Sequence, residues 1–121
     1  MTQITMPKGE YYIGDPCYVI EEWDEYLETV GFEGGVKEFR GMLTAKWYTK
    51  YGDGAYESDY GHTLLVDSGT IGCIPKELCT KDDGGGAFIE FEEDFTCEEI
   101  KDGVMQFGHL IVDTRDEDEY D

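Results

Sequence analysis

Basic residues are scarce in this chain: 9 lysines and arginines stand against 29 aspartates and glutamates, a formal net charge of −20 over 121 residues. Direct binding to nucleic acid or to an anionic membrane depends on a basic surface, so this composition argues against both. A net charge of magnitude ~2 to 8 is enough to keep a small domain soluble. The larger excess indicates a surface directed at a partner, and the partner that we expect is a basic protein.

Long hydrophobic runs are also missing. No apolar stretch approaches the ~18 residues that a membrane span requires, and the opening residues MTQITMPKGEYY lack the apolar core of a secretory signal. We therefore expect a cytoplasmic protein, in the host cytoplasm if it is encoded by a phage, with no membrane association.

Cysteine and histidine are few and lack the spacing of a metal site. No two cysteines stand two residues apart, and neither His62 nor His109 lies beside one. Structural zinc sites usually show such spacing, so we predict no metal and no other cofactor. The four cysteines are expected to be free, buried thiols: Cys17, Cys73, Cys79 and Cys97.

The chain has enough apolar residues to fold. Hydrophobic residues make up 40% of the sequence and aromatic residues 14%, far from the composition of chains that stay unfolded. A chain of this length is one domain and can bury a real core. We predict a single globular domain over residues 1–114, followed by an acidic disordered tail over residues 115–121.

One helix is expected in the first half of the chain. Tyr11–Ile13 predicts a strand, Gly14-Asp15-Pro16 a tight turn, and Cys17–Ile20 a second extended run. Between residues 21 and 30 the apolar positions fall at helical spacing and acidic residues occupy the open sides. This pattern predicts an amphipathic helix, which Gly31 ends.

Short strands dominate the rest of the pattern. Residues 75–79 predict a helical turn, and Asp102-Gly103 is typical of a hairpin. A connector is expected at Gly34 and Gly35 and a loop over residues 51–61. The predicted fold is α+β, a curved, mainly antiparallel sheet or partial barrel with one amphipathic helix packed on it. The expected strands are Met42–Thr49, Thr63–Asp67, Thr70–Ile74, Ala87–Glu92, Val104–Phe107 and His109–Asp113.

The acidic residues are clustered, with 17 of the 29 in the helix, in the strand pair before Gly103 and in the tail. Duplex DNA carries one negative charge per ~1.7 Å of its axis, and carboxylates gathered into one anionic stripe would offer a comparable density to a DNA-binding groove. The carboxylates that we expect to bind a partner are Glu21, Glu22, Asp24, Glu25 and Glu28 of the helix, Glu92, Glu93, Asp94, Glu98 and Glu99 of the strand pair, and Asp116, Glu117, Asp118 and Glu119 of the tail.

Two short patterns indicate chemistry less strongly. The loop Asp53–Asp59 places oxygen-bearing side chains at alternating positions but fails the spacing of an EF-hand, so a hairpin turn is favoured over weak divalent-cation binding. Leu64–Thr70 resembles the signature of aspartic proteases, in which Asp67 would pair with its symmetry mate in a homodimer. A turn residue between two strands is the favoured interpretation of Asp67.

Nothing else in the sequence singles out a catalytic group. No serine or cysteine has the context of a nucleophile, and the glycines at 84–86 do not follow the pattern of a phosphate-binding loop. We therefore expect a protein that is not an enzyme.

Three blocks of sequence together resemble a known family: Tyr12–Ile20 followed by Trp23, Gly52-Asp53-Gly54-x-Tyr56, and Val66–Gly72. The chain is similar in these blocks to a small uncharacterised family carried by bacteria and their phages, with a GDPCY turn motif and a VDSGTIG block. The resemblance implies a phage or mobile-element setting and supplies no mechanism. In physical terms, a proline turn and two glycine turns fix the directions of strands.

These observations lead to one hypothesis and two alternatives. The hypothesis is a non-enzymatic acidic protein, encoded by a phage or mobile element, that inhibits a basic nucleic-acid-binding host protein by mimicking the charge of DNA or RNA, as an anti-defence protein would. The first alternative is an immunity protein or antitoxin. The second is an enzyme, either a homodimeric aspartic-protease-like hydrolase that uses Asp67 or a cation-dependent hydrolase that uses Asp53 and Asp59.

Overall fold

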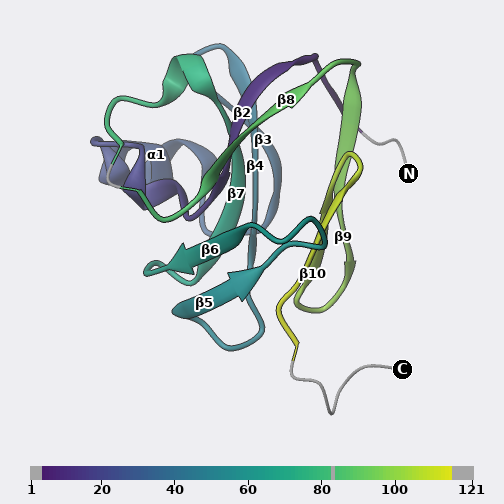
Figure 1. The fold of residues 1–121 in the computed structure, drawn as a ribbon. Coiled ribbons are helices and arrows are strands. Elements are labelled where there is room, and N and C mark those ends of the chain that lie inside the picture. The colour runs from purple at the N-terminus through teal and green to yellow at the C-terminus, as the bar shows by residue number, and fades with distance from the viewer. Residues whose placement is uncertain (1–3, 83, 116–121) are drawn as a thin grey trace.

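The computed structural model describes residues 4–82 and 84–115. Over these residues the chain forms three antiparallel sheets, one α-helix and two short 3-10 helices (Figure 1). The helix α1 spans Trp23–Val30, and the 3-10 helices span Pro16–Tyr18 and Lys76–Leu78. The strands are β1 (Thr5–Met6), β2 (Gly9–Gly14), β3 (Gly35–Phe39), β4 (Met42–Tyr48), β5 (Gly54–Glu57), β6 (Thr63–Val66), β7 (Thr70–Pro75), β8 (Ala87–Phe91), β9 (Phe95–Lys101), β10 (Val104–Phe107) and β11 (Leu110–Asp113).

The centre of the molecule is a five-stranded sheet in the order β3-β4-β7-β2-β8. Successive side chains of a strand point to opposite faces, so both faces of this sheet can be buried. On β2, for example, Tyr11 and Ile13 enter one core cluster and Tyr12 enters another. The sheet is therefore a middle layer with a hydrophobic core on each side.

Helix α1 covers one face of the central sheet through Tyr26 and Val30, which are both buried. The Tyr26 hydroxyl lies 3.1 Å from Thr44 Oγ1, and the Thr44 hydroxyl donates to the Lys37 carbonyl at 3.0 Å. Because Thr44 uses its only proton on that carbonyl, Tyr26 is the donor of the pair. This chain of bonds ties the helix to β3 and β4.

The other face packs against the second sheet, β1-β9-β10-β11, and against the β5–β6 hairpin. In Figure 1, α1 lies to the left of the central strands and β9 and β10 lie to the right. The layers are thus a helix, a five-stranded sheet and a second sheet. The residues that fill this second core include Met6, Ile13, Trp47, Leu64, Ile71, Phe91, Met105, Phe107 and Val112.

The expected α+β fold with one packed helix is confirmed. Within residues 4–82 and 84–115 none of the three sheets closes on itself, so the strands form open sheets and no complete barrel. The β9–β10 hairpin turns at Asp102 and Gly103, as the sequence predicts. Among the described residues, no helix has the length and apolar character needed to cross a bilayer.

Three local predictions were wrong. Cys17–Ile20 is not extended, because Pro16–Tyr18 forms a 3-10 turn whose Cys17 N–H is held by the Asp15 carboxylate at 3.0 Å. Strands β3 and β5 lie where a connector and a loop were expected. Both contain glycine and few β-branched residues, and pairing with β4 and β6 holds them extended.

Candidate partner-binding surface

The turn between β8 and β9 gathers three acidic side chains at the surface. Glu92, Glu93 and Asp94 are all exposed, and Asp94 Oδ1 accepts the backbone N–H of Lys8 at 2.9 Å. In the part of the chain that the structure describes, no lysine or arginine side chain forms an ion pair with these three carboxylates. The turn therefore presents uncompensated negative charge.

A cleft of ≈ 400 Å³ lies at this turn and adds aromatic rings to the three carboxylates. The rings of Phe91 and Phe95 stack at 3.8 Å, and the imidazole of His109 lies 5.4 Å from Phe91. The ring of Tyr60, 61% exposed, meets His109 edge-on at 5.1 Å. Phe91 and Phe95 are buried, so a cationic side chain at this cleft would meet the three carboxylates and the exposed ring of Tyr60.

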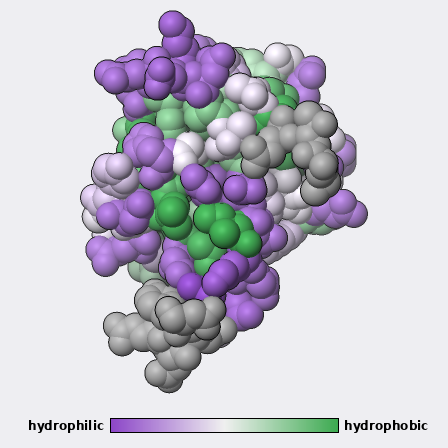
Figure 2. All heavy atoms as spheres, turned by 90° about the vertical axis from the view of Figure 1, so that its right-hand side faces the viewer, coloured by the Kyte–Doolittle hydropathy of each residue, from purple (hydrophilic) through white to green (hydrophobic). Residues whose placement is uncertain are grey.

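The exposed C-terminal part of β9 continues from this cleft. Glu98 and Glu99 are exposed and lie opposite Gln106 and Met105 of β10. Ile100, 44% exposed, follows them at the bulge in the β9–β10 register. Figure 2 shows the side of the molecule that carries β9 and β10, where a small apolar patch lies among hydrophilic residues and the upper end is strongly hydrophilic. The five strand-pair acids that the sequence singles out thus belong to one end and one edge of the same sheet.

The helix acids lie elsewhere, because α1 covers the opposite face of the central sheet. Glu22 and Glu25 form ion pairs with Arg40 at 3.2 Å and 3.0 Å, and these hydrogen bonds raise the pKa of the guanidinium. Asp24 and Glu28 are exposed, as is Glu21. The described residues therefore carry two separate acidic clusters, and the single continuous stripe expected from the sequence is not formed.

The tail acids Asp116, Glu117, Asp118 and Glu119 lie outside the described residues. Arg115, which precedes them, is described: its guanidinium forms a two-point ion pair with Asp113, at 2.9 Å from Nε and 2.8 Å from Nη2. This contact lowers the pKa of the Asp113 carboxyl.

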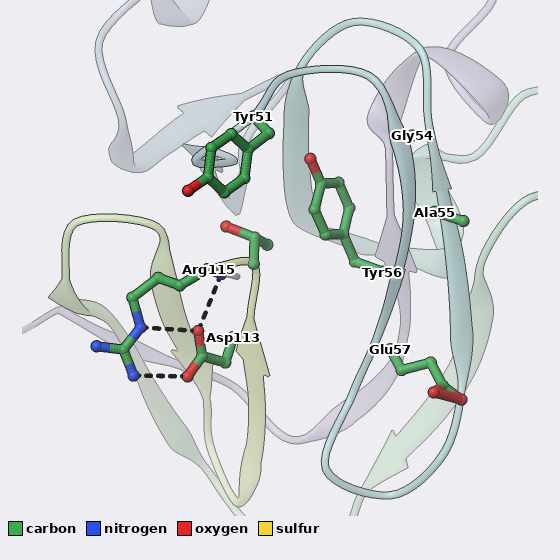
Figure 3. A pocket seen from close by; sticks show the side chains of 8 residues that line it. Tyr51, Gly54, Ala55, Tyr56, Glu57, Asp113 and Arg115 are labelled. Atoms are coloured by element: carbon green, nitrogen blue, oxygen red, sulfur yellow. Dashed lines mark hydrogen bonds and ion pairs between the residues drawn. The ribbon is translucent and has the colours of Figure 1, made fainter. Parts of the chain in front are cut away.

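A second cleft, of ≈ 500 Å³, lies between β5 and the end of β11 (Figure 3). Tyr51 and Tyr56 line one side, and the Asp113–Arg115 pair lines the other. The Tyr56 hydroxyl donates to the Gly52 carbonyl at 3.0 Å, which holds the ring in place.

The loop Asp53–Asp59, considered above for cation binding, has a structural role at its last residue. Asp59 Oδ1 accepts the N–H of Ile111 at 2.9 Å, and the Asp59 N–H donates to the Ile111 carbonyl at 2.9 Å. Across residues 4–82 and 84–115, no group of three or more histidine, cysteine, aspartate or glutamate side chains is placed to hold a metal ion.

Asp67 lies in the bend between β6 and β7 with its side chain exposed, the position of a turn residue. Its backbone N–H, rather than its carboxylate, makes the notable contact, donating to Asp15 Oδ2 at 2.7 Å.

The four cysteines are free thiols: Cys73 and Cys97 are buried, Cys17 and Cys79 half-buried. Burial raises the pKa of Cys17 and of Cys79 to about 12, so both thiols stay protonated at neutral pH.

Asp15 is the polar residue whose importance sequence reasoning missed. Its side chain is fully buried and accepts four hydrogen bonds. Its place beside the proline of the first turn is the only signal in the sequence, and that signal indicates a turn and not a buried acceptor.

Comparisons with models of known protein families, with curated proteins and with solved structures give no match.

Proposed function

We propose that this protein is a non-enzymatic binding protein. It binds a basic nucleic-acid-binding protein by placing carboxylates at the positions where that protein binds phosphates. The observation that carries the proposal is the set of uncompensated carboxylates at the β8–β9 turn, Glu92, Glu93 and Asp94, around a cleft lined by aromatic rings. We place such capture in a phage or mobile-element setting, the one that the sequence resemblance implies, and there it would act against host defence.

The chemistry of this surface favours cationic side chains over other ligands. A lysine or arginine that normally contacts phosphate can pair with one of these carboxylates and lay its aliphatic stem against the exposed ring of Tyr60. The chain-wide charge of −20 draws a basic partner in and speeds its association. Both effects weaken as salt screens the charges.

The two acidic clusters allow a matched comparison. One variant, Glu92→Gln with Glu93→Gln and Asp94→Asn, removes three charges at the turn. The control, Glu21→Gln with Asp24→Asn and Glu28→Gln, removes three charges on the helix side and leaves the Arg40 pairs intact. Both variants have the same net charge, so a difference between them reports position and not total charge.

The experiment is capture of basic proteins from host lysate at low and high salt, followed by competition with labelled duplex DNA. We expect the wild type and the helix-side control to capture a nucleic-acid-binding protein and to displace the duplex. The turn variant should bind at least tenfold more weakly, a change of about 1.4 kcal/mol. Equal capture by the two variants, or a captured protein that duplex DNA does not compete for, would contradict the proposal.

A further inference from the structure

The β5–β6 hairpin and the second sheet meet edge to edge at one short joint. Ser58 and Val112 form an isolated antiparallel bridge. The N–H of Asp59 donates to the Ile111 carbonyl at 2.9 Å, and the N–H of Ile111 donates to Asp59 Oδ1 at 2.9 Å. Beyond this joint the two strands separate, and the ≈ 500 Å³ cleft of Figure 3 opens between them.

The backbone of β5 directs hydrogen-bonding groups into this cleft. Peptide groups of an antiparallel strand alternate between its two neighbours. The Ser58 N–H donates to the His62 carbonyl on the β6 side, and the Asp59 N–H donates to β11. By alternation, the N–H and C=O of Ala55 point away from β6 and toward the cleft.

The opposite wall is the end of β11. Because the peptide groups of Ile111 face Asp59, alternation directs the carbonyl of Asp113 to the same side. The cleft is therefore bounded by two strand edges that meet at the Ser58–Val112 bridge and leave peptide groups unpaired beyond it among the described residues, a geometry that accepts an added strand.

The side chains around the cleft favour a positively charged occupant, because the basic residue among its lining, Arg115, is already paired with Asp113. Asp53 and Glu57 are exposed on the β5 side, and the Tyr51 ring, 51% exposed, stands beside the Tyr56 ring. Tyrosine faces attract lysine and arginine. With a net charge of −20 on the chain, an acidic segment is repelled from this edge.

We propose that the cleft between β5 and β11 binds an extended segment of a partner protein that carries lysine or arginine, by strand addition to the β5 edge at Ala55. Backbone hydrogen bonds supply affinity, and the tyrosine rings select basic side chains. This site shares no residue with the β8–β9 turn, so the result of testing it does not depend on whether the proposed function is correct.

The test uses an extended peptide of alternating lysine and valine, about eight residues long. Two control peptides have the same length: the lysine–valine peptide N-methylated at alternate residues, and a glutamate–valine peptide. A third control measures binding of the lysine–valine peptide to the protein variant Ala55→Pro. N-methylation removes strand pairing and keeps the charge. The Ala55→Pro variant removes the N–H that faces the cleft and keeps the hydrogen bonds to β6.

Binding is followed by amide chemical shifts in the full chain. We expect the lysine–valine peptide to shift the amides of Ala55, Glu57 and Arg115. N-methylation and Ala55→Pro should each weaken binding at least tenfold, and the glutamate–valine peptide should not bind. The charge variant of the β8–β9 turn should bind the peptide at this site within twofold of the wild type. Undiminished binding of the N-methylated peptide, or shifts confined to the β8–β9 turn, would overturn the proposal whether or not the Pro variant folds.

Discussion

The carboxylate of Asp15 accepts two hydrogen bonds from Ser68, one from the backbone N–H at 2.6 Å and one from the hydroxyl at 2.7 Å. The N–H groups of Cys17 and Asp67 complete the set at 3.0 Å and 2.7 Å. The proline turn after β2 is thereby fixed to the bend between β6 and β7, 53 residues away in the chain.

Replacing Asp15 with alanine should destabilise the fold strongly. The change leaves the N–H groups of Cys17, Asp67 and Ser68 without their acceptor, and each buried unsatisfied donor costs about 1–3 kcal/mol. We expect a loss of at least ~3 kcal/mol in the free energy of unfolding, measured by urea denaturation.

Asp67→Asn is the matched control, because it changes the neighbouring carboxylate without touching the backbone bond to Asp15. Its effect should stay within ~0.5 kcal/mol, as for other exposed positions. A similar loss for both variants would show that Asp15 does not have the role assigned here. The same variant also tests the hydrolase alternative, which requires wild-type peptidase activity that Asp67→Asn abolishes.

Gly72→Ala should also destabilise the protein. A Cβ at this position of β7 would lie 2.6 Å from the Ala45 carbonyl oxygen of β4 and 2.9 Å from Pro16 Cγ. Strand β7 would therefore have to move away from β4 and from the proline turn after β2. Overpacking of this kind costs about 1–3 kcal/mol. The loss of stability can be measured as a fall in the midpoint of thermal unfolding, with Gly41→Asn as the control. Gly41 has φ +83° and open space around it, a conformation that asparagine tolerates.

The Asp113–Arg115 pair predicts an acid-sensitive contribution to stability. Because the pKa of Asp113 is lowered in the folded state, its contribution is present above the unfolded pKa and is lost as pH falls through the folded one. Asp113→Asn should therefore reduce the free energy of unfolding by less than ~1 kcal/mol at neutral pH. The difference from wild type should shrink as the pH falls and vanish once the pH is below the lowered folded-state pKa of Asp113. A difference that persists there would mean that the variant loses packing and not the ion pair.

Salt should stabilise the folded protein. A compact chain with a net charge of −20 repels itself, and salt screens this repulsion over a Debye length that falls from ~10 Å at 0.1 M to ~3 Å at 1 M. We expect the thermal midpoint to rise by several degrees as sodium chloride increases over that range. A midpoint that falls would show that ion pairs such as Lys76–Glu10 outweigh the repulsion.

Local patterns predicted much of the fold correctly. Helix α1 has its apolar residues at helical spacing and ends at Gly31, whose N–H donates to the Leu27 carbonyl. Strand β10 matches its expected bounds, because a hairpin signal precedes it and its core residues are apolar. Strands β3 and β5 could not be predicted in the same way, since their own residues have little strand propensity and pairing with the next strand holds them extended.

For the candidate sites too, the sequence predicts local features and does not predict how they are arranged in space. The sequence shows which residues are acidic and that they come in clusters. It does not show that α1 and β9 pack on opposite faces of one sheet, because that depends on how the strands pair. Nor does it show that Arg40 neutralises part of the helix cluster while, within residues 4–82 and 84–115, Glu92 and Glu93 have no ion-pair partner.

By itself the sequence determined an acidic α+β domain with one amphipathic helix and glycine and proline turns at fixed places, because charge, periodicity and turn chemistry are local properties. The tertiary structure alone decided that a carboxylate beside a proline becomes the buried acceptor for a distant turn. It also decided that the acids face two sides of the molecule and that β5 and β11 leave a cleft between them. Each of these depends on strand order and register, which contacts between residues far apart in the chain select.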